Sequence, residues 1–191
     1  SNIGDDNQAL HSNPKKWNNL KLENMKFPLK HPKVLVCDKI VDDFIAATKS
    51  ADEIGFDVIE LHMAHGYLLH QFLSPLSNQR NDEFGGALDG RMRFPLQVFN
   101  AVRAAWPQHK ALGVRISATD WVDSSSWDVN EASQFTAALK AAGADFIDVS
   151  SGGNSPDQQI DVGPGYQIGF AATIKRETGL PTMAVGQLAK R

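Results

Sequence analysis

The sequence predicts an α/β fold in which parallel strands alternate with helices. From residue 38 onward, apolar residues at helical spacing alternate with short β-branched runs. Two helix-to-strand junctions, residues 55–59 and 143–147, look alike, and each begins with a glycine suited to end a helix. The apolar runs after these glycines are typical of parallel strands covered on both faces. Four such strands fit either a doubly wound sheet or half of a (β/α)8 barrel, which needs about 250 residues when complete.

The expected elements follow one another in a regular order. The first is a helix through Val41 and Ala51 that Gly55 ends, and a strand at residues 57–61 comes next. The others are, in order, a helix through Met92 and Trp106 ended by Pro107, a strand at Leu112–Ser117, a helix with a capping box of Asp128 and Glu131 that ends at Gly143, a strand at Phe146–Val149, a helix at Tyr166–Thr178 closed by Gly179, and a strand at Thr182–Val185.

The first part of the chain has a different character. Residues 1–33 are rich in Asn and Lys, contain three prolines and show no clear period. A structureless stretch of this length is uncommon inside a compact domain. We therefore expect residues 1–37 to be a loop or excursion that leads into a domain at residues 38–191, or to follow sequence that is missing from the chain.

Composition excludes several classes of function. With 191 residues and 42% hydrophobic content the chain can bury one sizeable core, and a net charge of −3 offers no basic stripe for nucleic acid or an anionic membrane. The single cysteine, Cys37, excludes an internal disulfide and fits a reducing compartment. Because no apolar run approaches the roughly 18 residues of a membrane span and the first residues are polar, we expect a cytoplasmic protein without signal peptide, membrane or nucleic-acid partner.

Unusual polar residues stand where the predicted strands end. His62 and His65 follow the first strand, and Tyr67 comes just after them. The two histidines allow three interpretations: a hydrogen-bonded pair, two ligands of a metal ion, or two donors that hold a ligand oxygen. No third metal ligand lies close in sequence, so we expect no metal site. In the last interpretation the hydroxyl of Tyr67 is placed to give a proton; otherwise Tyr67 is ordinary loop packing.

Arg115 lies inside a predicted strand, between two apolar residues. Strand alternation places Val114 and Ile116 toward the covering helices and Arg115 with Ser117 on the other face. A guanidinium there needs an anionic or strongly accepting partner. Glu60 is one candidate partner, and a bound anionic ligand is the other.

Two further motifs point to loop structure first. Residues 78–86 combine Asn, Asp and two glycines, which build turns, and we expect Arg80 and Asp82 to fix that loop. Residues 150–153, Ser-Ser-Gly-Gly, allow either an anion-binding nest of backbone N–H groups or a plain turn after the strand.

Taken together, these segments resemble the NADH:flavin oxidoreductase/old yellow enzyme family, and within it the thermophilic-like bacterial ene-reductases. The similarity covers about residues 38–188 and rests on separate motifs in the right order: residues 60–68, 72–75, Asn78, Arg80, 82–86, Arg91, 114–117, 164–167 and 184–186. The resemblance implies a (β/α)8 TIM barrel, with this chain covering roughly strands 4–7.

The resemblance also implies a cofactor and a role for five residues. FMN would lie at the mouth of the barrel, with NADPH or NADH as its reductant. His62 and His65 would hold the substrate carbonyl oxygen above the flavin, His62 would also contact the flavin itself, and Tyr67 would serve as proton donor. Arg115 would contact the pyrimidine edge of the flavin, and Gly186 would approach its phosphate.

The implied reaction reduces the C=C bond of an α,β-unsaturated carbonyl compound, by hydride transfer from flavin N5. Two alternatives stay open: a segment of a larger FMN/iron–sulfur enzyme of the dienoyl-CoA reductase or trimethylamine dehydrogenase kind, or a non-catalytic half barrel. The partner expected is the small substrate, and a homo-oligomer is among the states that the sequence allows.

Overall fold

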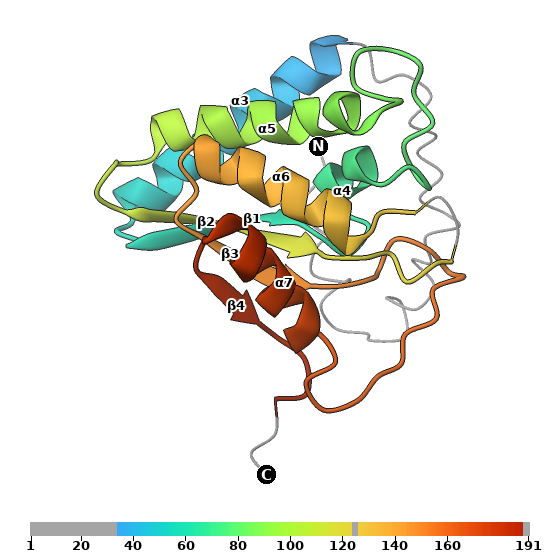
Figure 1. Ribbon diagram of the computed structural model, residues 1–191. Helices are drawn as coiled ribbons and strands as arrows, with labels where there is room; N and C mark the ends of the chain where they lie inside the picture. Colours follow the sequence, from blue (N-terminus) through green and yellow to red (C-terminus); the bar gives the residue numbers. More distant parts are fainter. Residues whose placement is uncertain (1–33, 124–125, 189–191) are drawn as a thin grey trace, which may run out of the picture. The chain divides into compact units, whose positions relative to one another are not determined.

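A four-stranded parallel sheet forms the centre of the computed structural model, which describes residues 34–123 and 126–188. Its strands are adjacent in the order of the chain: β1 (Val58–Met63), β2 (Ala111–Ser117), β3 (Phe146–Ser150) and β4 (Thr182–Ala184), as Figure 1 shows. The predicted parallel βαβ arrangement and the predicted strands are therefore confirmed.

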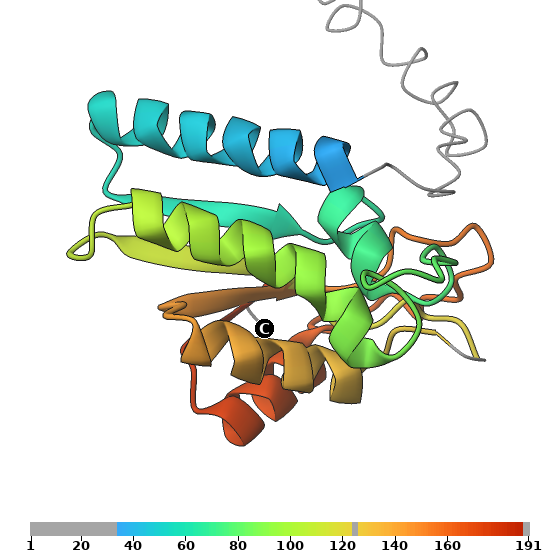
Figure 2. The same ribbon diagram turned by 90° about the horizontal axis from the view of Figure 1, so that it is seen from above.

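The long helices all pack on one side of the sheet. They are α3 (Val34–Glu53), α5 (Leu88–Ala105), α6 (Val129–Ala141) and α7 (Ile168–Thr178). Helix α3 contacts α5, α5 contacts α6, and α6 contacts α7, so the helices form a single layer (Figure 2). A doubly wound sheet would carry helices on both faces, whereas a barrel wall carries them on its outer face alone. The arrangement is that of a barrel wall.

The two faces of the sheet differ in chemistry. One face is apolar and buried, and it includes Leu61, Met63, Val114, Ile116, Ile147 and Val149. The alternate positions Glu60, His62 and Met183 are exposed, and Arg115 is half-buried. Alternation along each strand thus separates an apolar face, which packs on the helices, from a face that carries ionisable side chains.

The start of α6 shows how the local sequence sets an element boundary. Oδ1 of Asp128 accepts hydrogen bonds from the backbone N–H groups of Asn130 and Glu131, both at 2.9 Å, as an N-cap should. The reciprocal half of the predicted capping box is wrong. The Glu131 carboxylate instead accepts hydrogen bonds from the guanidinium of Arg91 on α5, which ties the two helices together.

Other boundaries differ from the prediction by a few residues. Helix α3 begins at Val34, so the expected division of the chain at residue 37 falls inside this helix. Strand β1 runs to Met63 and so includes His62. The short helix α4 (Leu68–Leu73) was not predicted, because its six residues span less than two turns. The expectation for residues 1–33 lies outside the described residues.

No helix within residues 34–123 or 126–188 is both long and apolar enough to cross a bilayer.

Candidate active site at the strand ends

Three of the predicted site residues meet at the end of β1. The imidazole rings of His62 and His65 have their centroids 5.3 Å apart, and the ring of Tyr67 lies 5.0 Å from that of His62. Tyr67 is 57% exposed, and His62 also reaches solvent. These three side chains therefore form one accessible polar cluster, which we call the histidine cluster.

The neighbouring strands hold His65 in place. Its backbone has φ +57°, a left-handed conformation that non-glycine residues rarely adopt. Its backbone N–H donates to Ser117 Oγ at 2.9 Å. The ring atom Nε2 lies 2.7 Å from Ser150 Oγ. A Cβ on Gly153 would come within 2.5 Å of His65 Cα, so only glycine fits there. The ends of β2 and β3 thus fix the turn after β1.

Both histidines of the cluster favour the neutral form. Burial, together with the positive charges of the neighbouring His62 and Arg115, lowers the pKa of His65 to about 4. Partial burial is also the main cause that lowers the pKa of His62. A neutral imidazole carries one N–H donor and one acceptor nitrogen, so each ring can give one hydrogen bond to a ligand oxygen.

Arg115 lies beside His62 in the sheet, and its partner is Asp148. The register sets His62 opposite Arg115 and Arg115 opposite Asp148. Arg115 Nη1 lies 3.0 Å from Asp148 Oδ2, so Glu60, which the sequence suggested, is not the ion-pair partner found. Partial burial and the charge of Asp148 raise the pKa of Glu60. Nε of Arg115 is buried and has no hydrogen-bond partner within residues 34–123 and 126–188.

Gly186 lies just beyond β4 and is tied to the same strand ends. Its φ is +94°, and a Cβ there would come within 2.6 Å of Gln167 Nε2 and 2.7 Å of the Tyr166 ring. Gln167 Nε2 donates to the carbonyl of Val185 at 2.8 Å, and Gln167 Oε1 accepts from Ser151 Oγ at 2.5 Å. Side chains of this chain therefore already explain why position 186 is a glycine.

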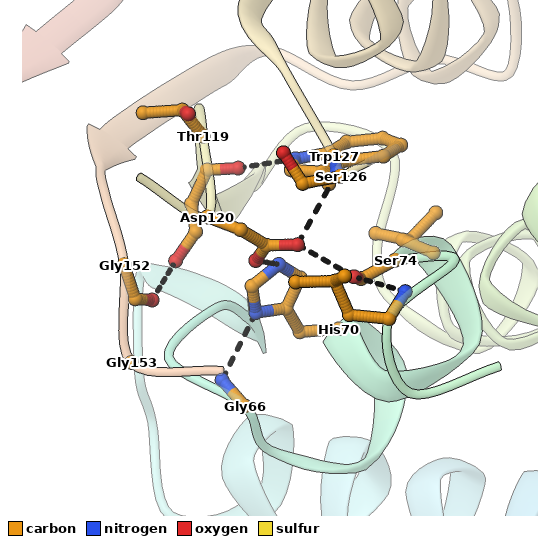
Figure 3. A network of polar contacts seen from close by, with 12 residues as sticks. Gly66, His70, Ser74, Thr119, Asp120, Ser126, Trp127, Gly152 and Gly153 are labelled. Atoms are coloured by element: carbon orange, nitrogen blue, oxygen red, sulfur yellow. Dashed lines mark hydrogen bonds and ion pairs between the residues drawn. The ribbon is translucent and has the colours of Figure 1, made fainter. Parts of the chain in front are cut away.

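A buried polar network beneath the histidine cluster was not predicted. It joins His70 on α4, Ser74 at the end of α4 and Asp120 after β2 (Figure 3). Both His70 and Asp120 are fully buried, with Nε2 of the histidine 3.3 Å from Oδ1 of the carboxylate. His70 follows the histidine cluster closely in sequence, but nothing in the pattern distinguishes it from a core residue of an apolar helix.

The loop motifs serve structure, as most of the sequence reasoning indicated. Asn78 Nδ2 donates to the carbonyls of Phe72 and Phe84, and Arg80 pairs with Asp82. In the 150–153 segment the anion-nest interpretation is wrong. The N–H of Gly152 donates to Thr119 O at 2.8 Å, and that of Gly153 donates to a side-chain oxygen at 2.7 Å. These donors are occupied within the chain.

In the part of the chain that the structure describes, no three His, Cys, Asp or Glu side chains are grouped so that they could hold a metal ion.

Known proteins match the chain over most of its length. The NADH:flavin oxidoreductase / NADH oxidase family matches residues 17–191. The NADPH dehydrogenase of Clostridium acetobutylicum is 45% identical over 164 residues, which are 86% of this chain and 48% of that protein. The NADPH dehydrogenase of Geobacillus thermodenitrificans is 47% identical over 149 residues, or 78% of this chain and 43% of that protein.

Solved structures show the same fold. A 2-naphthoyl-CoA reductase in complex with 2-naphthoyl-CoA superposes with a TM-score of 0.74 at 23% identity, over 81% of this chain and 24% of the reductase. At this identity the likeness is one of fold alone. The chain spans about half the length of the two dehydrogenases or slightly less.

Proposed function

The chain belongs to the NADH:flavin oxidoreductase / NADH oxidase family and has part of its (β/α)8 barrel, and from this we propose that its strand ends hold FMN and an α,β-unsaturated carbonyl substrate. The proposed reaction is reduction of the substrate C=C bond. The observation that carries the proposal is the histidine cluster, a pair of neutral imidazoles and a tyrosine that lie together beside an arginine. The relatives named NADPH dehydrogenase support NADPH as the reductant, with NADH as the alternative.

The residues present fit a flavin. Arg115 keeps a buried, unpartnered Nε–H on the face of the sheet that carries the histidine cluster, and a ring with acceptor atoms would satisfy it. We assign the pyrimidine edge of FMN to Arg115, one face of the ring to His62, and the phosphate end to the backbone at Gly186. When bound, FMN supplies the hydride for the substrate. Asp148 offsets part of the positive charge of Arg115, so the guanidinium acts there as a directed hydrogen-bond donor more than as a free charge.

His62 and His65 are proposed to bind the carbonyl oxygen of the substrate. A donor pair stabilises this oxygen most when negative charge develops on it, which is how such a pair accelerates the reaction. His65 can donate a hydrogen bond to the substrate oxygen only from Nδ1. This requires the hydroxyl of Ser150 to donate its hydrogen bond to Nε2, so that the ring proton is on Nδ1. Ser150 Oγ lies 2.7 Å from His65 Nε2 and 3.4 Å from Gln167 Oε1, so the shorter contact favours donation to the histidine.

Tyr67 is proposed to protonate the substrate carbon that does not receive the hydride. Its ring lies against that of His62, and its side chain is exposed, so it can approach a substrate that the histidines hold. A phenol hydroxyl is a suitable acid for a carbon that becomes basic during the reaction.

The test uses phenol, whose ionised oxygen resembles the charged oxygen of the reacting substrate. In the flavin-loaded protein we expect phenol to give a long-wavelength charge-transfer band. The double variant His62→Ala/His65→Ala should lose that band and still bind FMN, because it removes the contact of His62 with the ring but leaves Arg115 and the phosphate end untouched. The band is measured by absorption during a phenol titration, and the flavin content by release on denaturation.

A matched control removes a histidine elsewhere. His109 is exposed and precedes β2, at the end of the sheet opposite the histidine cluster, so His109→Ala should keep the band. Phenol binding that survives in the double variant would show that the histidines do not hold the substrate oxygen.

A further inference from the structure

The buried network under the histidine cluster contains a charge for which the proposed reaction has no direct use. Both side chains of the His70–Asp120 pair are fully buried, and burying a carboxylate is costly unless several donors surround it. Asp120 Oδ2 accepts from Ser74 Oγ at 2.5 Å and from the N–H of Trp127 at 3.2 Å, while Oδ1 faces His70 Nε2 (Figure 3). Burial opposes ionisation of Asp120, but the contact with His70 and the hydrogen bonds from Ser74 and the backbone N–H of Trp127 outweigh it and lower its pKa.

The other ring nitrogen of His70 determines which tautomer is present. The backbone N–H of Gly66 donates to His70 Nδ1 at 2.9 Å, so Nδ1 carries a lone pair and no proton. The ring proton is therefore on Nε2, and it faces the negative charge of the Asp120 carboxylate, whose Oδ1 lies 3.3 Å from that nitrogen. Asp120 fixes His70 as an acceptor for Gly66.

Gly66 belongs to a strained turn that presents the histidine cluster. His65 and Gly66 have consecutive positive φ angles of 57° and 73°. Such a conformation in a non-glycine residue is strained and persists only when surrounding contacts hold it. The two N–H groups of this turn are held by side chains, that of His65 by Ser117 and that of Gly66 by His70. Gln71 Nε2 holds the Gly66 carbonyl at 2.7 Å.

We propose that His70 and Asp120 are positioning residues, which keep the turn at His65 and Gly66 in the conformation that aims the histidine cluster at the substrate oxygen. They act through the Gly66 N–H and touch neither FMN nor substrate. The substrate part of this inference rests on the proposed function, whereas the tautomer of His70 and its link to Gly66 do not.

The test is Asp120→Asn, which keeps the shape of the side chain. The amide oxygen must face the two donors, Ser74 and Trp127, so the NH2 group faces His70 Nε2. The ring proton then moves to Nδ1, where it opposes the Gly66 N–H. We expect 15N NMR of the His70 ring to change from the Nε2–H to the Nδ1–H tautomer. Phenol affinity of the flavin-loaded protein should fall about tenfold, because two opposed buried donors must separate. Flavin content should not change.

Asp128→Asn is the matched control, because Asp128 caps α6 from the surface and asparagine caps a helix equally well. It should change neither the His70 tautomer nor the phenol affinity. A wild-type ring with its proton on Nδ1, or an Asp120→Asn protein that binds phenol as tightly as wild type, would overturn the inference.

A second pair of variants decides the matter if Asp120→Asn does not fold. His70→Asn places an amide oxygen near the position of Nδ1 and should retain more phenol affinity than His70→Leu, which leaves the Gly66 N–H without an acceptor. Equal affinities in these two variants would contradict the positioning role. A wild-type protein that binds FMN but gives no phenol band would count against the proposed function and leave the tautomer result standing.

Discussion

His65 combines a strained backbone, a half-buried ring and two polar neighbours, and these features set its protonation. Burial lowers its pKa from the ordinary value of 6.5 to about 4. In the unfolded chain the same ring takes up a proton near its ordinary pKa. Between these two values the unfolded state binds more protons, so the free energy of unfolding falls as the pH is lowered from 6.5 toward 4.

This gives a prediction for the single residue. An NMR titration that follows the ring carbon-bound protons of His65 should have its midpoint near pH 4. His109, which is exposed, serves as the internal comparison in the same spectra. A His65 midpoint close to that of a histidine in a peptide would mean that the ring is not buried as described.

Site residues that are close in sequence were predictable, and those that are distant were not. His62, His65 and Tyr67 lie within six residues of one another at the end of a strand, so their spacing was enough to group them. The pairing of Arg115 with Asp148 depends on the register between β2 and β3, which the pattern of one strand does not contain. Glu60 was the wrong choice for the same reason.

At the scale of elements, helix α6 shows what local sequence determines. Its N-terminus was predicted because the cap needs only Asp128 and the two N–H groups that follow it. The role of Glu131 was missed, since Arg91 on another helix offers it a charged partner. Local hydrogen bonds can therefore be predicted from the sequence unless a tertiary contact competes for the same side chain.

The cap allows a quantitative prediction. Asp128→Ala should lower the free energy of unfolding by about 1 kcal/mol, because two N–H groups of the first turn lose their acceptor. Asp128→Asn should stay close to wild type. Denaturant unfolding of the three proteins measures this difference, and equal stability of the alanine and asparagine variants would show that the cap contributes nothing.

At the scale of the whole molecule, one face of the sheet forms the core and the other carries the candidate site. The apolar face packs on one layer of helices, and the opposite face presents Arg115, Asp148 and the histidine cluster at the strand ends. Alternation along the strands predicted this division, and the single helix layer distinguished a barrel wall from a doubly wound sheet. The sequence pattern alone left that choice open, because strand and helix order is the same in both.

The central claim is that this polar face binds FMN through Arg115, and FMN affinity tests it most directly. The comparison is made in an Asp148→Asn background, so that no buried carboxylate loses its partner. Titration of the protein, expressed in its complete reading frame, with FMN should show saturable binding in wild type and in Asp148→Asn. Adding Arg115→Met should weaken binding about tenfold, the loss expected for a charged hydrogen-bond donor. The same substitution at Arg93, which is exposed and pairs with Glu83, should have no effect. Failure of the wild-type protein to bind FMN, or equal affinities with and without Arg115, would contradict the account.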